Sequence, residues 1–214
     1  MKKKSYFWCY LSILFILAFV LWTILVKVVD LKAIGPNSSV VGFATINGWI
    51  SNKIGVNFML YNVTDWLGFV PIAVALSFAI LGVIQWIKRK SLLKVDKNLF
   101  VLGAFYIVVF AVYVLFEFVV INRRPVLIEG ILEASYPSST TMLVLSVMPT
   151  ALLQLKARIK NKVLKNVVVY TIIAFVAFML IGRVIAGVHW FSDIIGGILF
   201  SVGAVTGYYF FSKN

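Results

Sequence analysis

Long apolar runs, separated by short polar segments, make up most of this chain. A helix needs about 20 apolar residues to cross the hydrocarbon core of a bilayer. Six runs reach or approach that length: 7–29, 66–87, 99–121, 141–155, 167–185 and 194–211. The fourth is the shortest and contains Pro149, so we expect its helix to start near residue 138 and to be interrupted at the proline. The pattern predicts an all-α fold, a six-transmembrane-helix bundle forming a single membrane domain over residues 1–214.

The polar segment between the first two runs, residues 30–65, is the longest in the chain. Within it, apolar side chains recur at helical spacing and polar side chains fall on the other faces: Phe43, Ile46, Ile50 and Ile54 against Asn47, Ser51 and Lys53. This pattern predicts a short amphipathic helix that lies on the outer membrane surface. An ordinary connecting loop is the alternative.

Composition supports the membrane class. Hydrophobic residues make up 62% of the chain and charged residues only 13%, whereas a soluble domain carries about a quarter charged residues. The first run follows three lysines, as in a signal peptide, but it is too long and lacks a small-residue cleavage site, so we interpret it as a retained helix. Cys9 is the only cysteine, which excludes an intramolecular disulfide.

Charge predicts the orientation. If the N-terminus faces the cytoplasm, most of the 20 basic residues lie inside: Lys2, Lys3, Lys4, Lys88, Arg89, Lys90, Lys94, Lys97, Lys156, Arg158, Lys160, Lys162, Lys165 and Lys213. The positive-inside rule then places both termini in the cytoplasm. The net charge of +13 is also typical of nucleic-acid binding, but these cations lie in short loops beside apolar helices and fit contact with anionic lipid headgroups. We expect a multi-pass protein of a bacterial plasma membrane, with membrane lipids and no nucleic acid as partners.

Ionisable and hydroxyl side chains gather at the predicted outer ends of the helices. Three groups are separated in the sequence: Arg123, Arg124, Glu129 and Glu133 after the third run; Ser138 and Ser139 at the start of the fourth; and Arg183, His189 and Asp193 around the turn from the fifth to the sixth. On the predicted topology all three groups reach the same face. Ionisable residues at a membrane are costly and usually functional, so the sequence predicts one site at the outer leaflet.

The residue types in this site suit phosphate chemistry. Two guanidinium groups, Arg124 and Arg183, and the free N–H groups at the helix start beside Ser138 form an anion cradle. His189 beside it is suited to attack phosphorus, and Asp193, four residues on, to hold the imidazole in the right tautomer. With one histidine and no cysteine cluster, a metal site is not expected. A hydrogen-bonding role for His189 at the helix start is the alternative.

The spacing of these residues resembles that of a known protein family. The pattern Arg183-x5-His189-x3-Asp193, preceded by Tyr136-Pro137-Ser138 and by Arg124-Pro125, resembles the three-part signature of the type 2 phosphatidic acid phosphatase superfamily, membrane branch. The resemblance implies metal-independent hydrolysis of lipid phosphates or diphosphates through a phosphohistidine, without a cofactor. By matched position it implies His189 as nucleophile, Asp193 as its orienting partner, and four phosphate ligands: Arg124, Ser138, Ser139 and Arg183.

The sequence departs from this signature at four positions. Glu117 stands where the family has a lysine, unless Arg123 replaces that cation, and Thr140 stands where the family has the histidine that protonates the leaving group. Ser139 replaces a glycine, which leaves its backbone N–H available. Gly182 replaces the serine before Arg183, which removes one hydroxyl from the cradle.

The replacement of the family's acidic histidine by Thr140 predicts which substrates are hydrolysed faster. Losing a positioned acid costs about 10² to 10⁴ in rate, and most for a poor leaving group such as a glycerolipid alkoxide. We therefore expect a lipid diphosphate, such as undecaprenyl or another polyprenyl diphosphate, to be favoured over phosphatidate. Glu129 or Glu133 is a further candidate to supply the proton. The competing hypotheses are a non-catalytic protein that binds or transports lipid phosphates, and a structural subunit whose polar cluster only caps helices.

Overall fold

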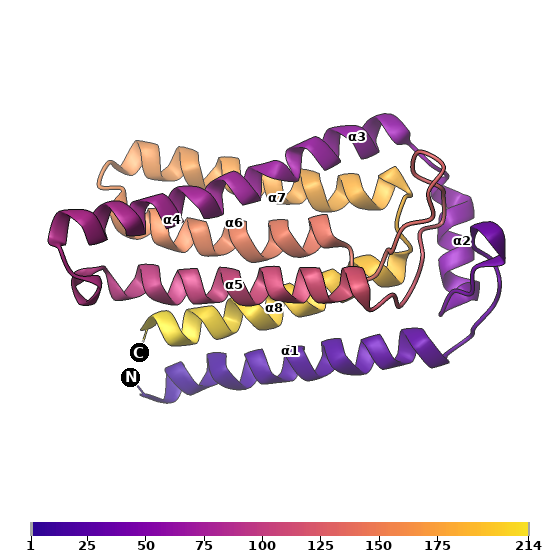
Figure 1. Ribbon diagram of the computed structural model, residues 1–214, viewed down its shortest axis with the longest axis horizontal. Helices are drawn as coiled ribbons and strands as arrows, with labels where there is room; N and C mark the ends of the chain where they lie inside the picture. The colour runs from indigo at the N-terminus through magenta and orange to yellow at the C-terminus, as the bar shows by residue number, and fades with distance from the viewer. Residues whose placement is uncertain (1, 214) are drawn as a thin grey trace.

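The computed structural model describes residues 2–213, which form eight α-helices and two short 3₁₀ helices. In chain order they are α1 (Lys2–Val28), η1 (Pro36–Ser38), α2 (Ala44–Ile54), α3 (Phe58–Leu67), α4 (Phe69–Arg89), η2 (Leu92–Lys94), α5 (Lys97–Phe118), α6 (Ser139–Arg158), α7 (Lys162–Ala186) and α8 (Phe191–Lys213). Figure 1 shows the long helices running side by side along one axis. The all-α bundle expected from the sequence is confirmed.

Six segments are long and apolar enough to cross a membrane: Tyr6–Val28, Phe58–Arg89, Lys97–Phe118, Ser139–Arg158, Lys162–Ala186 and Phe191–Lys213. They correspond to the six predicted runs. The second is longer than predicted, because α3 continues into α4 through Gly68, whose backbone is itself helical. The third ends at Phe118 and not at residue 121, where a polar loop takes over.

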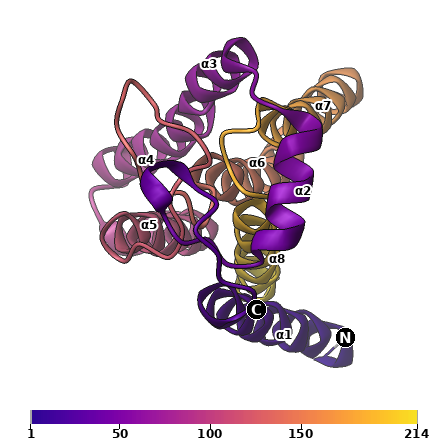
Figure 2. The same ribbon diagram turned by 90° about the vertical axis from the view of Figure 1, so that its right-hand side faces the viewer.

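Pro149 does not interrupt α6, so that expectation was wrong. The helix runs from Ser139 to Arg158 with the proline inside it. α6 lies in the middle of the bundle and packs against α4, α5, α7 and α8 (Figure 2). This packing offsets the hydrogen bond that proline removes, as is common in membrane helices.

α1 and α8 pack closely in antiparallel directions, which brings the two termini to the same end of the bundle (Figure 1). Small residues on α8 allow the approach: a Cβ at Gly203 would lie 2.9 Å from Ile16, and one at Gly207 would lie 2.7 Å from Ser12. The Ser12 hydroxyl donates to the Gly203 carbonyl at 2.7 Å. Small residues and short polar contacts of this kind are typical of helix pairs in membranes.

α2 crosses the opposite end of the bundle (Figure 2), so the predicted short helix is present. Its orientation differs from the prediction. Asn47, expected on the solvent side, is buried, accepts from the Ser192 N–H at 3.1 Å and donates to the Ser192 hydroxyl at 2.9 Å. Ile46 is exposed. A buried polar pair with the start of α8 therefore decides which face of α2 contacts the protein.

Candidate active site

His189 lies at the end of the bundle that α2 crosses, in the short turn between α7 and α8. The turn depends on Gly187, which has a φ of +67° and ends α7. A Cβ there would lie 1.9 Å from the Gly55 carbonyl oxygen, so only glycine fits. The turn directs His189 into the protein, where its side chain is only 6% exposed.

Hydrogen bonds define the tautomer of His189. Its Nε2 lies 3.2 Å from Arg124 Nη1 and 3.0 Å from Arg183 Nη2. A guanidinium group only donates, so Nε2 must accept and Nδ1 carries the proton. Nδ1 lies 3.1 Å from the Ser135 carbonyl oxygen, to which it donates. The lone pair of Nε2 therefore faces the two guanidinium groups.

The charge state of His189 follows from the same surroundings. Burial of the imidazole, reinforced by the positive charges of Arg124 and Arg183, holds the pKa of His189 well below its ordinary value. The imidazole is therefore neutral at pH 7. A neutral imidazole keeps the nucleophilic lone pair that the protonated form lacks.

Arg124 and Arg183 reach His189 from two different segments. Arg124 comes from the loop after α5, and its Nε lies 2.9 Å from Glu133 Oε2. Arg183 comes from the last turns of α7, is only 1% exposed, and its Nη1 lies 3.5 Å from Asp65 Oδ1. Among the described residues, Arg183 Nε has no hydrogen-bond partner. A buried guanidinium N–H without an acceptor is suited to receive one from a ligand.

Asp193, predicted as the orienting partner of the imidazole, is linked to it through a third residue. Ser135 lies between them: its hydroxyl donates to Asp193 Oδ2 at 2.5 Å and lies 3.1 Å from His189 Nδ1. Asp193 also accepts from the Trp190 N–H and from Asn122 Nδ2. The prediction assumed that both residues share a helix face, but α8 begins only at Phe191, so helical spacing does not apply to His189.

The two predicted serines have different surroundings. The Ser138 N–H donates to the Asp193 carbonyl at 3.0 Å, and the Ser138 hydroxyl accepts from Thr141. Ser138 is fully buried and does not line the cavity beside His189, so its N–H is committed to α8. Ser139, the first residue of α6, does line that cavity.

That cavity has a volume of about 480 Å³ and is mostly polar. Its lining includes His189 and charged side chains from three segments: Asp65, Glu117, Arg123, Arg124 and Glu133. Arg123 lies at its edge and donates to the Leu132 carbonyl at 2.8 Å. The structure thus brings His189 and the charged side chains of α3, α5 and the loop after α5 together around one space. Arg183 contacts His189 but does not line this cavity.

Two other positions lie away from this cavity. Glu129 is exposed at the tip of the loop, in a turn closed by hydrogen bonds between Ile128 and Ile131, and does not line the cavity. Thr140, where the family has its acid, points elsewhere: a Cβ added at Gly68 would lie 3.5 Å from its methyl group. Glu133 is therefore the only member of the predicted acidic pair that borders the cavity.

Several residues of the site were not predicted from the sequence. Ser135 and Asn122 hold Asp193, and Tyr61, Thr64 and Asp65 of α3 lie against the arginines. Ser135 directly precedes the Tyr136-Pro137-Ser138 motif, which was a usable signal. Nothing in the spacing of α3 points to the arginines, because that contact depends on how α3 packs on α7.

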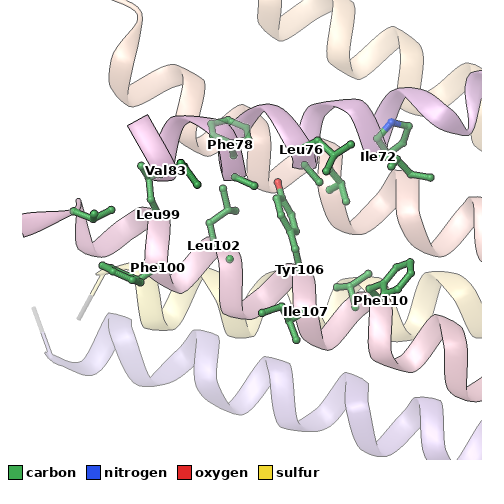
Figure 3. Close-up of a pocket in the computed structure, with 18 of the residues that line it drawn as sticks. Ile72, Leu76, Phe78, Val83, Leu99, Phe100, Leu102, Tyr106, Ile107 and Phe110 are labelled. Carbon is green, nitrogen blue, oxygen red and sulfur yellow. The ribbon is translucent and has the colours of Figure 1, made fainter. Parts of the chain in front are cut away.

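A second, larger cavity of about 790 Å³ lies between α4 and α5. Figure 3 shows its apolar lining, with Phe78, Leu102, Tyr106 and Phe110 among the labelled side chains. No arginine, lysine, histidine or carboxylate of the described residues lines it. Its lining is apolar, whereas that of the cavity beside His189 is mostly polar.

Comparisons with known proteins agree with the site. Residues 117–214 match the family model of the PAP2 superfamily. The fold is similar to the crystal structure of the first transmembrane PAP2 type phosphatidylglycerolphosphate phosphatase from Bacillus subtilis, with a TM-score of 0.57, 21% sequence identity and 94% of each chain covered. No curated protein sequence matches the chain. The resemblance to the type 2 phosphatidic acid phosphatase superfamily is thus confirmed: residues 117–214 match the model of that superfamily, and the fold is similar to that of a transmembrane protein of the PAP2 type.

Proposed function

We propose that this protein is a metal-independent membrane lipid phosphatase that works through a phosphohistidine at His189. One observation carries the proposal: the lone pair of a neutral, buried imidazole nitrogen faces two guanidinium groups at 3.0 and 3.2 Å. A phosphoryl group bound there would accept the hydrogen bonds that the arginines now direct at Nε2. It would then lie beside the nucleophile with its charge stabilised by fixed donors.

The proposed reaction has two steps. Nε2 of His189 attacks phosphorus, the bond from phosphorus to the leaving oxygen breaks, and the phosphorylated imidazole gains a positive charge. The Ser135 carbonyl, which accepts from Nδ1, and Asp193 behind the Ser135 hydroxyl stabilise that charge. Water then attacks phosphorus, the bond from phosphorus to Nε2 breaks, and inorganic phosphate leaves the neutral imidazole.

We propose a lipid diphosphate, such as undecaprenyl or another polyprenyl diphosphate, as the favoured substrate over phosphatidate. The chemistry of the leaving group supports this preference. Thr140 does not line the polar cavity, so the position of the family's acid supplies no proton there. A phosphate monoester leaves as an anion without protonation, whereas a glycerolipid alkoxide needs the proton.

The apolar cavity between α4 and α5 is the proposed site of the substrate's hydrocarbon chain. It approaches the polar cavity along α5 and α6. Phe110 lines the apolar cavity, Tyr113 lines the polar one, and their ring centroids lie 5.7 Å apart. On α6, Leu143 and Met142 are likewise neighbours on the two linings. Neighbouring side chains on α5 and α6 thus line both cavities, which supports placing the phosphate in one and the hydrocarbon chain in the other.

The proposed orientation places both termini in the cytoplasm of a bacterial plasma membrane and the site at the outer leaflet. The basic loops around η2 and between α6 and α7 lie at the end that holds the termini (Figure 1), and the site lies at the other end. The excess of basic residues at the end that holds the termini supports the cytoplasmic placement of that end. Accessibility of a cysteine introduced at Glu129, labelled from outside intact cells, tests it.

The second candidate is a protein that binds or transports lipid phosphates without hydrolysis. Glu117 and Thr140 favour this candidate, because they replace the lysine and the histidine of the family signature. An enzyme that had lost its activity would keep the anion site and lose such residues. Phosphate release by purified protein in detergent, from polyprenyl diphosphate and from phosphatidate, separates the candidates. We expect release from the diphosphate that disappears in His189→Ala. Lipid-phosphate binding without release from either substrate would favour the second candidate.

A further inference from the structure

α3 lies outside the residues that match the superfamily, yet three of its side chains reach the site. Tyr61, Thr64 and Asp65 occupy one face of the helix, because residues three and four apart are neighbours on a helix surface. This face packs against the last turns of α7, where Arg183 lies. A hydrogen bond from the Asn57 N–H to the Ala186 carbonyl, 3.0 Å long, ties the start of α3 to the end of α7.

All three side chains contact Arg183. Thr64 Oγ1 lies 3.4 Å and Asp65 Oδ1 lies 3.5 Å from Arg183 Nη1, and Arg183 Cζ lies 5.2 Å from the centre of the Tyr61 ring. The Tyr61 ring also lies 5.9 Å from Arg124 Cζ. The Thr64 hydroxyl donates to carbonyls of its own helix, so its oxygen is an acceptor for the arginine.

The contacts with α3 involve one nitrogen of the guanidinium group and one face of its plane. Nη1 is held by α3, Nη2 points at His189 Nε2, and Nε is buried without a partner. A stacked aromatic ring restrains the plane of the guanidinium group. The orientation of Arg183 relative to the nucleophile is therefore determined by α3.

Gly182 makes this arrangement possible. A Cβ at residue 182 would lie 2.8 Å from the Thr64 methyl group, so a side chain there would push α3 away. This is the position at which the chain lacks the serine that the superfamily resemblance implies. The hydroxyl beside Arg183 is supplied here by Thr64, from another helix.

We propose that Tyr61, Thr64 and Asp65 form a positioning face that holds Arg183, and through the Tyr61 ring Arg124, in the geometry for phosphoryl transfer to His189. This inference rests on the proposed function. It adds residues of α3, which lies outside the matched region 117–214, to the site. It also makes Gly182 and Thr64 a matched pair, because the missing side chain at 182 leaves room for Thr64.

The first test removes single contacts. Thr64→Val keeps the shape of the side chain and loses the acceptor, and Tyr61→Leu loses the ring, whereas Tyr61→Phe keeps it. Loss of a hydrogen bond to a charged group predicts a fall in kcat/KM of about 10- to 100-fold for Thr64→Val. We expect a similar fall for Tyr61→Leu and little change for Tyr61→Phe. Thr206→Val is the matched control, since that buried threonine bonds only within α8.

Inhibition by inorganic phosphate separates positioning from folding. A misplaced Arg183 weakens phosphate binding, so the inhibition constant should rise together with the fall in kcat. A purely structural role would reduce the active fraction and leave KM and the inhibition constant unchanged, which would overturn the proposal. Thr64→Ser, which keeps the acceptor, should retain most of the activity and provides the comparison if Thr64→Val folds poorly.

The second test uses the matched pair. Gly182→Ser alone should lower activity, because its side chain meets Thr64. Combined with Thr64→Ala, the same change has room and restores a hydroxyl beside Arg183, so activity should recover. No recovery in a well-folded double variant would contradict the proposal. An active wild type that is abolished by His189→Ala but indifferent to these variants would sink only this inference, whereas a wild type without phosphatase activity would sink the proposed function.

Discussion

The two halves of this chain contribute to the site in different ways. The half from the end of α5 onward carries the sequence signature, the proposed nucleophile His189, and Arg124 and Arg183. The half before it carries no motif, yet Asn47 of α2 binds the start of α8 and α3 holds Arg183. The residues proposed to react thus lie in the C-terminal half, and residues of the N-terminal half contact them or the helix that carries them. The difference explains why a motif identifies the site without describing its geometry.

Changing an arginine of the C-terminal half should have the largest effect. Arg183→Lys keeps the charge but loses the planar fork that reaches both Thr64 and His189. We expect phosphate release to fall about 10²- to 10³-fold, as when a fixed donor to the transition state is removed. Arg158→Lys, at the opposite end of the bundle, is the control. Equal rates for the two variants would show that Arg183 contributes only charge.

Ser135→Ala tests the link between Asp193 and His189. The variant removes the hydroxyl that bridges the carboxylate to the imidazole but keeps the carbonyl that accepts from Nδ1. We expect kcat to fall about 10- to 100-fold with little change in KM, because effects of residues behind a reacting group are typically of this size. Ser146→Ala, a buried serine of α6 that bonds Ser201, is the control. An unchanged kcat would remove Ser135 from the proposed mechanism.

The N-terminal half should show its contribution as stability. Asn47→Ala leaves the buried Ser192 N–H without its acceptor, which costs about 1–3 kcal/mol. Thermal unfolding in detergent should show the loss, with a smaller change in kcat than for Ser135→Ala. Asn52→Ala, an exposed position of the same helix, should unfold like the wild type. A normal unfolding temperature for Asn47→Ala would mean that α2 is not anchored through this contact.

The smallest expected change is in the charge of His189 near neutral pH. Because its pKa in the folded protein is lowered, the imidazole should stay neutral, with the proton on Nδ1, at pH 6.5. His189 is the only histidine, so selective ¹⁵N labelling reports it alone. In the unfolded chain the pKa of a histidine is near 6.5. Below that pH the unfolded chain gains a proton that the folded protein does not bind. The free energy of unfolding should therefore fall as the pH drops below about 6.5 and should not change above it. Half-protonation at pH 6.5 in the folded protein would contradict the proposed surroundings.

The six spans could be predicted from the sequence, because they depend on the lengths of the apolar runs. The segments that meet at the site could also be predicted, because this depends only on the end of the helix at which a residue lies. The sequence was not enough for the contacts within the site. The spacing of His189 and Asp193 was interpreted as helical, but α8 begins only at Phe191, and the sequence did not reveal that the Ser138 N–H donates to the Asp193 carbonyl. The roles of Tyr61 and Thr64 depend on the approach of α3 to Gly182, which no local pattern encodes.

The most direct test of the account is to trap the covalent intermediate. Purified protein is mixed for milliseconds with polyprenyl diphosphate carrying a ³²P-labelled terminal phosphate, quenched in alkaline detergent and separated by electrophoresis. We predict label on the wild-type chain that is stable in base, is lost in acid as expected of a phosphohistidine, and is absent from His189→Ala. Phosphate release without any labelled protein, or label that persists in His189→Ala, would contradict the claim that His189 attacks phosphorus.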